Sequence, residues 1–239
     1  CKHCLIVTDQ ILLSLGHLEK ITAALKEQNI TAVIFADTVP EPNSSSIITG
    51  IEFFKAGGFD SIVAIGGGSV MDSAKAINVM GTHGGNISDY KVPHDQSQSG
   101  VRLIAIPTTA GTGSEATRFT VITDDQSHEK MLCTGIGYVP DAALIDYTLT
   151  LTMPPRVTAD SGFDALTHAV EAYVSQRANP YSDSQALAAL RLIGPNLSRV
   201  YHDPDNHHAR EAMMLGATLA GIAFSSASVA LVHGMSRPI

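Results

Sequence analysis

Short apolar runs alternate with amphipathic segments along the first half of the chain. The runs rich in β-branched residues are CLIVTD, AVIFAD, SIVAIGG and VRLIAIPT. The segments between them carry apolar residues at helical spacing and are HLEKITAALKEQN, SSIITGIEFFKAG and SVMDSAKAINVM. Strands that alternate with such helices are typical of βαβ units, in which helices cover both faces of a parallel sheet. The pattern therefore predicts an α/β fold with a mostly parallel sheet.

The pattern changes at two points in the second half of the chain. Residues 119–146 contain three strand candidates separated by polar turns, FTVIT, KMLCT and AALID. We interpret this stretch as a hairpin appended to the sheet. After MPP at 153–155 the chain is rich in Ala and Leu and has helical periodicity. The sequence thus predicts an α/β domain at residues 1–152 and an all-helical domain at residues 153–239.

Composition and charge narrow the classes of partner. The chain has 239 residues, of which 44% are hydrophobic, enough to bury a sizeable core. A formal net charge of −8, with 15 Lys and Arg residues and no basic run, argues against nucleic acid or a membrane as partner. Without an apolar run of membrane-spanning length or a signal-peptide pattern, we expect a cytoplasmic protein that binds small molecules. Because the chain starts at Cys1 and stops in SRPI without a terminating pattern, we expect a fragment of a longer chain.

The densest glycine signal is AIGGGSVMDSAKA at residues 64–76, between an apolar run and a helical pattern. Consecutive glycines allow close approach of the backbone, and the free N–H groups of a helix start favour a bound phosphate. The stretch does not match G-x-G-x-x-G, because Met71 stands where that motif has its third glycine. It does not match a P-loop either. It is either a pyrophosphate site or a plain glycine-rich turn. GTGSEA at 111–116 fits G-x-G-x-x-A formally, but it follows PTTA, so we interpret it as a second loop lining the same cleft.

Two acids follow predicted strands directly, Asp9 and Asp37. Ligands of open α/β sheets bind beyond the carboxyl ends of the strands. Either carboxylate could accept hydrogen bonds from a ribose hydroxyl and repel an added 2′-phosphate. This favours NAD over NADP as the dinucleotide.

Asp164 and His168 lie four residues apart in FDALTHAVEAY, a segment with helical periodicity. Residues at this spacing share one face of a helix, so the carboxylate and the imidazole can point at one metal ion. The alternative is an ordinary Asp–His contact on a solvated face that also carries Glu171. In that interpretation the neighbouring core stripe consists of Phe163, Leu166, Val170 and Val174.

Four motifs in order, GGGSVMDSAKA, IPTTAGTGSEAT, DSGFDALTHAVEAY and VHGM, resemble the iron-containing (group III) alcohol dehydrogenase family. The resemblance covers essentially the whole chain. It implies a Rossmann-like dinucleotide-binding domain at 1–152 and an all-helical metal-binding domain at 153–239, incomplete at its C-terminus, in a dehydroquinate synthase-like architecture. It also implies a homodimer and hydride transfer between a primary or secondary alcohol and the nicotinamide.

The resemblance assigns site residues motif by motif. The implied cofactor-binding residues are Asp9, Gly66, Gly67, Gly68, Ser69, Asp72, Thr108, Thr109, Thr112 and Lys130. The implied metal ligands are Asp164, His168 and His233 of the HGM motif, with a fourth, a histidine, expected beyond Ile239. Such a set suits Fe²⁺ or Zn²⁺, and the sequence does not choose between them.

One position departs from the family pattern. Many members carry a second histidine four residues after the HGM histidine, where it can relay a proton, and this chain has Arg237 there. Arginine does not deprotonate at ordinary pH, but it can bind an anionic group of the substrate or cofactor. We take His233 and Arg237 as the candidate catalytic residues.

The favoured hypothesis is an NAD-dependent, divalent-metal-dependent alcohol dehydrogenase or aldehyde reductase, acting on a small alcohol or aldehyde. One alternative is a polyol or sugar-phosphate dehydrogenase of the same fold, related to glycerol dehydrogenase or dehydroquinate synthase. DSGFDALTHAVEAY favours the alcohol dehydrogenase branch. A third hypothesis is a dinucleotide-binding module without turnover, motivated by Arg237 and by the point at which the chain stops.

Overall fold

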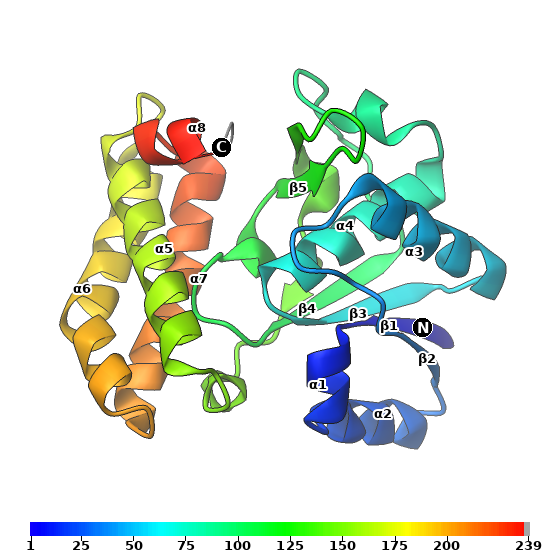
Figure 1. Ribbon diagram of the computed structural model, residues 1–239, viewed down its shortest axis with the longest axis horizontal. Helices are drawn as coiled ribbons and strands as arrows, with labels where there is room; N and C mark the ends of the chain where they lie inside the picture. The colour runs from blue at the N-terminus through cyan, green and yellow to red at the C-terminus, as the bar shows by residue number, and fades with distance from the viewer. Residues whose placement is uncertain (237–239) are drawn as a thin grey trace. The chain divides into compact units, whose positions relative to one another are not determined.

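The structure is a computed structural model that describes residues 1–236, and its contacts divide into two units (Figure 1). The sheet unit consists of Cys1–Ile106 and Arg118–Leu144. The helical unit consists of Pro107–Thr117 and the chain from Ile145 onward. These units differ from the predicted domains 1–152 and 153–239, because residues 107–117 and 145–152 make their contacts within the helical unit. The domain boundary after residue 152 stays a prediction.

Five strands form the main sheet, in the order β2-β1-β3-β4-β7. Their bounds are His3–Val7 (β1), Thr31–Phe35 (β2), Ser61–Gly66 (β3), Arg102–Pro107 (β4) and Ala142–Ala143 (β7). Strand β1 pairs in parallel with β2 and β3, and β4 pairs in parallel with β7. All of β3 is buried, as expected for a central strand of a sheet covered on both faces. The predicted parallel sheet is confirmed.

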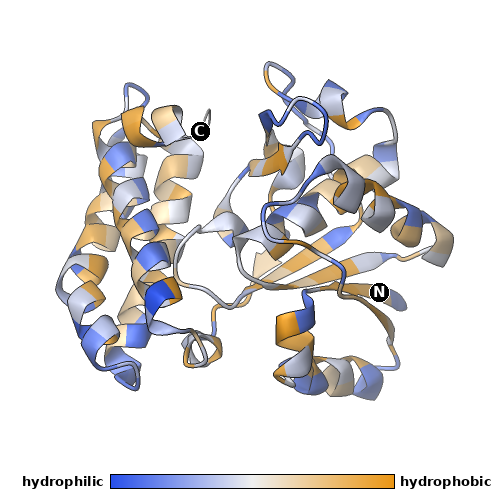
Figure 2. Ribbon diagram, in the orientation of Figure 1, coloured by the Kyte–Doolittle hydropathy of each residue, from blue (hydrophilic) through white to orange (hydrophobic). Residues whose placement is uncertain are grey.

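Four helices flank this sheet. Their bounds are Gln10–Ser14 (α1), Leu18–Glu27 (α2), Ser44–Gly57 (α3) and Gly68–His83 (α4). Figure 1 shows α3 and α4 on one side of the strands and α1 and α2 on the other. Leu5 and Ile62 of the strands pack with Ala74 and Ile77 of α4 in one buried cluster. The strands are correspondingly apolar in Figure 2, and the predicted helices on both faces are confirmed.

The predicted hairpin forms, but as a sheet of its own. Strands β5 (Phe119–Thr123) and β6 (Lys130–Thr134) pair in antiparallel, and their sheet is separate from the main one. The hairpin packs on α4, where the hydroxyl of Thr120 donates to the carbonyl of Asp72 at 2.9 Å. The third strand candidate shortens to β7, which joins the main sheet next to β4. Asp141 holds this edge, because its Oδ2 accepts from the backbone N–H of Leu103 at 2.9 Å.

The helical unit contains the predicted helices. Their bounds are Pro155–Val174 (α5), Pro180–His202 (α6), His207–Ala227 (α7) and Leu231–Ser236 (α8). The start of α6 is fixed by Asn179, whose side chain accepts from Ser182 N, and the start of α7 by Asn206, which accepts from Ala209 N. Among the described residues, no helix combines the length and the apolar character needed to cross a membrane.

The buried face of α5 is made of small residues rather than of large apolar ones. Ala165 and Ala169 belong to the core cluster shared with α6 and α7. Phe163 and Val174, by contrast, are 60% and 64% exposed. Of the core stripe considered from the sequence, Leu166 packs against this cluster, but Phe163, Val170 and Val174 are exposed, so the stripe is wrong for these three residues. Small side chains face the neighbouring helices because they let helix backbones approach closely.

The loop 107–117 packs against α7 within the helical unit. Gly113 has a φ of +62°, and a Cβ added to it would lie 2.6 Å from the Cα of Gly221. This close approach requires glycine on both sides of the contact. The contact explains why residues 107–117 join the helical unit, although the first of them, Pro107, is the last residue of β4.

Candidate metal centre and cofactor loops

Helix α5 carries Asp164 and His168 on one face, as their spacing predicts. The Nδ1 atom of His168 lies 3.8 Å from Oδ2 of Asp164. The helix is continuous from Pro155 to Val174, so the relative placement of the two side chains follows from helical geometry alone.

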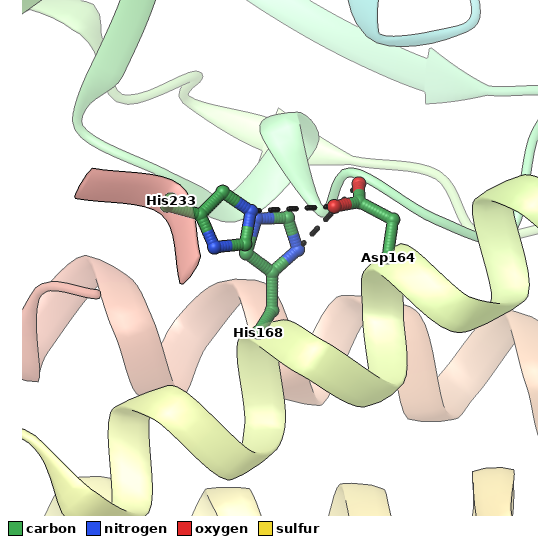
Figure 3. A group of neighbouring side chains, drawn as sticks. All are labelled: Asp164, His168 and His233. Atoms are coloured by element: carbon green, nitrogen blue, oxygen red, sulfur yellow. Dashed lines mark hydrogen bonds and ion pairs between the residues drawn. The ribbon is translucent and has the colours of Figure 1, made fainter. Parts of the chain in front are cut away.

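His233 reaches the same point from α8. Its Nε2 atom lies 3.3 Å from Oδ1 of Asp164, and its ring stacks on that of His168 with centroids 4.4 Å apart. One potential ligand atom from each of Asp164, His168 and His233 lies within 4.8 Å of the others. Figure 3 shows the three side chains converging, two from α5 and one from α8. The structure thus brings together all three predicted metal ligands.

His168 and Asp164 both have the protonation state that a metal ion requires, for different physical reasons. His168 is buried, and burial lowers its pKa to about 4, so the ring is neutral at pH 7. Burial acts to raise the pKa of Asp164, but the hydrogen bond with His233 and the nearby imidazoles outweigh it and lower that pKa. A neutral imidazole and an ionised carboxylate are the forms that coordinate a cation.

Glu171 is a member of this site that the sequence did not reveal. It is 3% exposed, which corrects its placement on a solvated face. Its carboxylate accepts hydrogen bonds from Nδ1 of His233 and from the backbone N–H of Val232, the latter at 2.6 Å. Burial lowers the pKa of His233, but its hydrogen bonds with Asp164 and Glu171 outweigh burial and raise it. The available signal was the i,i+3 spacing from His168, which places Glu171 on the same face of α5.

Phe224 is a second contact that the sequence analysis missed. Phe224 lies in α7, and its ring stacks on the imidazole of His168 with the centroids 4.2 Å apart. The same imidazole also stacks on the ring of His233. This sandwich restricts the rotation of His168. No period in the sequence links α7 to α5.

The chemistry of the cluster fits a divalent cation. It offers two imidazoles and one carboxylate, a donor set that Zn²⁺ and Fe²⁺ both accept. Nδ1 of His168 is buried and has no hydrogen-bond partner among the described residues, so this atom is available to coordinate a metal ion. Arg237, the other candidate catalytic residue, lies outside the described residues.

The glycine-rich stretch forms the turn between β3 and α4. Gly66 ends β3, Gly67 caps α4, and Gly68 and Ser69 lie in the first helical turn. A Cβ added to Gly66 would lie 2.5 Å from Cβ of Val70, so the turn is too tight for a side chain. The first-turn N–H groups of a helix have no intrahelical acceptor, which is the arrangement that binds phosphate in other proteins.

The other predicted cofactor residues fall in both units. Oδ1 of Asp9 caps α1 by accepting from Leu12 N at 2.8 Å. The backbones of Asp9 and Asp37 form an isolated antiparallel β-bridge just beyond the ends of β1 and β2. Oδ2 of Asp72 accepts from Val121 N at 3.0 Å, so this carboxylate also holds the hairpin. The amino group of Lys130 lies 3.9 Å from Glu41. The remaining three are in loop 107–117 of the helical unit, namely Thr108, Thr109 and Thr112.

Comparison with known families agrees with this arrangement. The model of the family described as iron-containing alcohol dehydrogenase matches residues 1–147. The model of its C-terminal part, Fe-containing alcohol dehydrogenase family, C-terminal, matches residues 158–239. The chain belongs to the iron-containing alcohol dehydrogenase family. The resemblance carried by the four sequence motifs is thereby confirmed.

Individual members of the iron-containing alcohol dehydrogenase family are similar over the whole chain. Long-chain-alcohol dehydrogenase 1 of Geobacillus thermodenitrificans is 39% identical over 100% of this chain and 60% of its own length. A crystal structure of 1,3-propanediol oxidoreductase superposes with a TM-score of 0.94 at 37% identity, covering 98% of this chain and 62% of that one. Sulfoacetaldehyde reductase from Bifidobacterium kashiwanohense, in complex with NAD⁺, superposes with a TM-score of 0.91 at 30% identity. The match covers 99% of this chain and 62% of that one. The chain thus spans about 60% of the length of the relatives it matches.

Proposed function

We propose that this chain functions as an NAD-dependent, divalent-metal-dependent alcohol dehydrogenase or aldehyde reductase. The observation that carries the proposal is the cluster of Asp164, His168 and His233 in a member of the iron-containing alcohol dehydrogenase family. His233 is far in sequence from the other two, and the three side chains are buried or half-buried and aimed at one point.

The metal ligands in this proposal are Asp164, His168 and His233. A divalent ion held by these side chains would lower the pKa of the substrate alcohol and, in the reverse direction, polarise the carbonyl. Neutral His168 and ionised Asp164 are ready to bind a cation without a change of protonation. Iron is the metal in the family's name, and the ligand set suits Fe²⁺ or Zn²⁺.

The dinucleotide site in this proposal starts at the turn between β3 and α4. The residues that hold the pyrophosphate are Gly66, Gly67, Gly68 and Ser69, with Asp72 beside them. Asp9 accepts from the adenosine ribose, and its negative charge selects NAD over NADP. The nicotinamide supplies the hydride acceptor when bound. Thr108, Thr109, Thr112 and Lys130 orient the phosphate and nicotinamide end.

The substrate class in this proposal is a small alcohol or aldehyde. The names of the relatives mention long-chain alcohols, 1,3-propanediol and sulfoacetaldehyde, which share a hydroxyl or carbonyl group but little else. His233 contacts the reaction centre as a metal ligand, and Arg237 binds an anionic group of the substrate or cofactor. A homodimer in the cytoplasm completes the proposal.

The test measures NADH formation from a panel of short alcohols and diols by metal-stripped protein and by protein reloaded with Fe²⁺ or Zn²⁺. We expect turnover that depends on metal and disappears in Asp164→Ala and His168→Ala. Asp160→Ala is the matched control, because this carboxylate lies on the same helix with 70% of its side chain exposed. Its activity should equal that of the wild type.

Two other outcomes would replace the proposal. If the protein binds NADH but oxidises no alcohol with any metal, the chain is a dinucleotide-binding module. Metal-dependent turnover confined to polyols or phosphorylated substrates would instead assign it to the polyol or sugar-phosphate dehydrogenase branch.

A further inference from the structure

We infer that Glu171 is a positioning residue that holds His233, both its backbone and its ring, so that Nε2 is presented to the metal centre. The inference rests on the proposed function only in treating His233 as a ligand. Glu171 is outside the group of ligand atoms that lie within 4.8 Å of one another, so it contacts a ligand rather than the ion.

Glu171 anchors the backbone that carries His233. Its Oε1 accepts from Val232 N at 2.6 Å, and its Oε2 lies 3.4 Å from His233 N. Both N–H groups belong to the first turn of α8, where they have no intrahelical acceptor. A helix of six residues is not stable by itself, and a carboxylate at its N-terminus stabilises it. Glu171 therefore ties α8 to α5.

Glu171 also determines which nitrogen of His233 carries the proton. An ionised carboxylate can only accept hydrogen bonds, so the Nδ1 atom that contacts Oε2 must be the donor. In a neutral ring this leaves the lone pair on Nε2, the atom that lies 3.3 Å from Asp164. A carboxylate behind a coordinating histidine orients the ring and raises its basicity as a ligand.

One helix thereby organises the whole cluster. Asp164, His168 and Glu171 follow one another at i, i+4 and i+7 along α5, which places them on one face. The first two offer ligand atoms directly, and Glu171 orients the third ligand, which arrives 62 positions later in the chain. The relative positions of the three ligands thus depend on a single helix, α5.

The first measurement is the tautomer of His233 in metal-free protein, recorded by long-range ¹H–¹⁵N NMR at a pH where the ring is neutral. We expect the proton on Nδ1 in the wild type and in Glu171→Gln, whose amide oxygen can still accept it. In Glu171→Ala we expect the proton on Nε2, donated to Asp164. A proton on Nε2 in the wild type, or no change in Glu171→Ala, would overturn the inference.

The second measurement is Zn²⁺ affinity of metal-stripped protein by calorimetry. Loss of the charge in Glu171→Gln should weaken binding about 10-fold, and Glu171→Ala should weaken it by up to about 100-fold. Glu211→Gln is the control, because this exposed glutamate lies in α7 of the same unit and should leave the affinity unchanged. Equal affinities in all four proteins would contradict the inference.

The two measurements separate this inference from the proposed function. If the wild type binds no Zn²⁺, or binds it as well after Asp164→Ala, the proposed metal centre fails. The tautomer experiment still decides whether Glu171 orients His233. The near-isosteric Glu171→Gln keeps one acceptor oxygen where the carboxylate has two, and circular dichroism checks that it folds.

Discussion

The hydroxyl of Thr218 donates a 2.7 Å hydrogen bond to Oε1 of Glu115, across 103 positions of the chain. Both residues are buried, one in α7 and the other in the GTGSEA segment. The segment that formally resembled a dinucleotide fingerprint is thus attached to the helical unit. Together with the contact between Gly113 and Gly221, this hydrogen bond determines where loop 107–117 lies.

Replacing Thr218 by Val should destabilise the protein by about 1–3 kcal/mol, because a buried carboxylate loses a hydrogen-bond donor while the side-chain volume is kept. Thr218→Ser retains the hydroxyl and should recover most of that loss. Urea denaturation of the two variants measures the difference. Equal stabilities of the Val and Ser variants would show that the hydrogen bond contributes nothing.

Replacing Gly221 by Ala should destabilise the helical unit by about 1–3 kcal/mol, because the new Cβ would lie 2.6 Å from the carbonyl oxygen of Gly113. Ser226→Ala is the control in the same helix, at an exposed position where the change should stay within about 0.5 kcal/mol. Thermal unfolding monitored by circular dichroism compares them. A Gly221→Ala variant as stable as Ser226→Ala would contradict the close packing of the loop on α7.

The stabilising effect of Asp141 should depend on pH. Burial acts to raise the pKa of Asp141, but hydrogen bonds from Leu103 N and Arg102 outweigh it and hold the pKa below the ordinary 3.8. The folded protein therefore binds fewer protons here than the unfolded chain, so the stabilisation is complete well above pH 3.8 and is lost as the pH falls through the lowered pKa.

Asp141→Asn should accordingly cost about 1 kcal/mol at pH 7, with the difference from the wild type shrinking towards pH 3. Arg102→Ala should cost less than about 0.5 kcal/mol, because the Arg102 side chain is 80% exposed and its ion pair is screened by solvent. Urea titrations between pH 7 and pH 3 measure both. A difference that does not change with pH would rule out the charge of Asp141 as its cause.

In the proposed function Asp9 selects NAD over NADP, so removing its charge should relax that selection. Asp9→Asn keeps the cap of α1, since an asparagine oxygen accepts from Leu12 N as well as an aspartate oxygen does. Loss of repulsion from the 2′-phosphate should raise NADPH affinity relative to NADH by about tenfold. Fluorescence titration with both nucleotides checks this. If Asp37→Asn has the larger effect, Asp37 rather than Asp9 faces the ribose.

Much of the fold and part of the site follow from the sequence because they depend on local periods. Alternating apolar runs and amphipathic segments specify the β1, β2, β3 and β4 strands and their helices, and Ala-rich periodicity specifies α5, α6 and α7. The i,i+4 spacing alone places Asp164 and His168 on one face of a helix, and the resemblance to a family supplied His233.

Tertiary packing decided the rest. Sequence period shows that α5 has an apolar side, but the close fit of α6 and α7 selects Ala165 and Ala169 for burial and leaves Phe163 and Val174 exposed. The same packing buries Glu171 against α8 and carries His233 to Asp164. A local pattern encodes the direction of a side chain on its own helix, whereas burial and long-range partners depend on which other elements pack there.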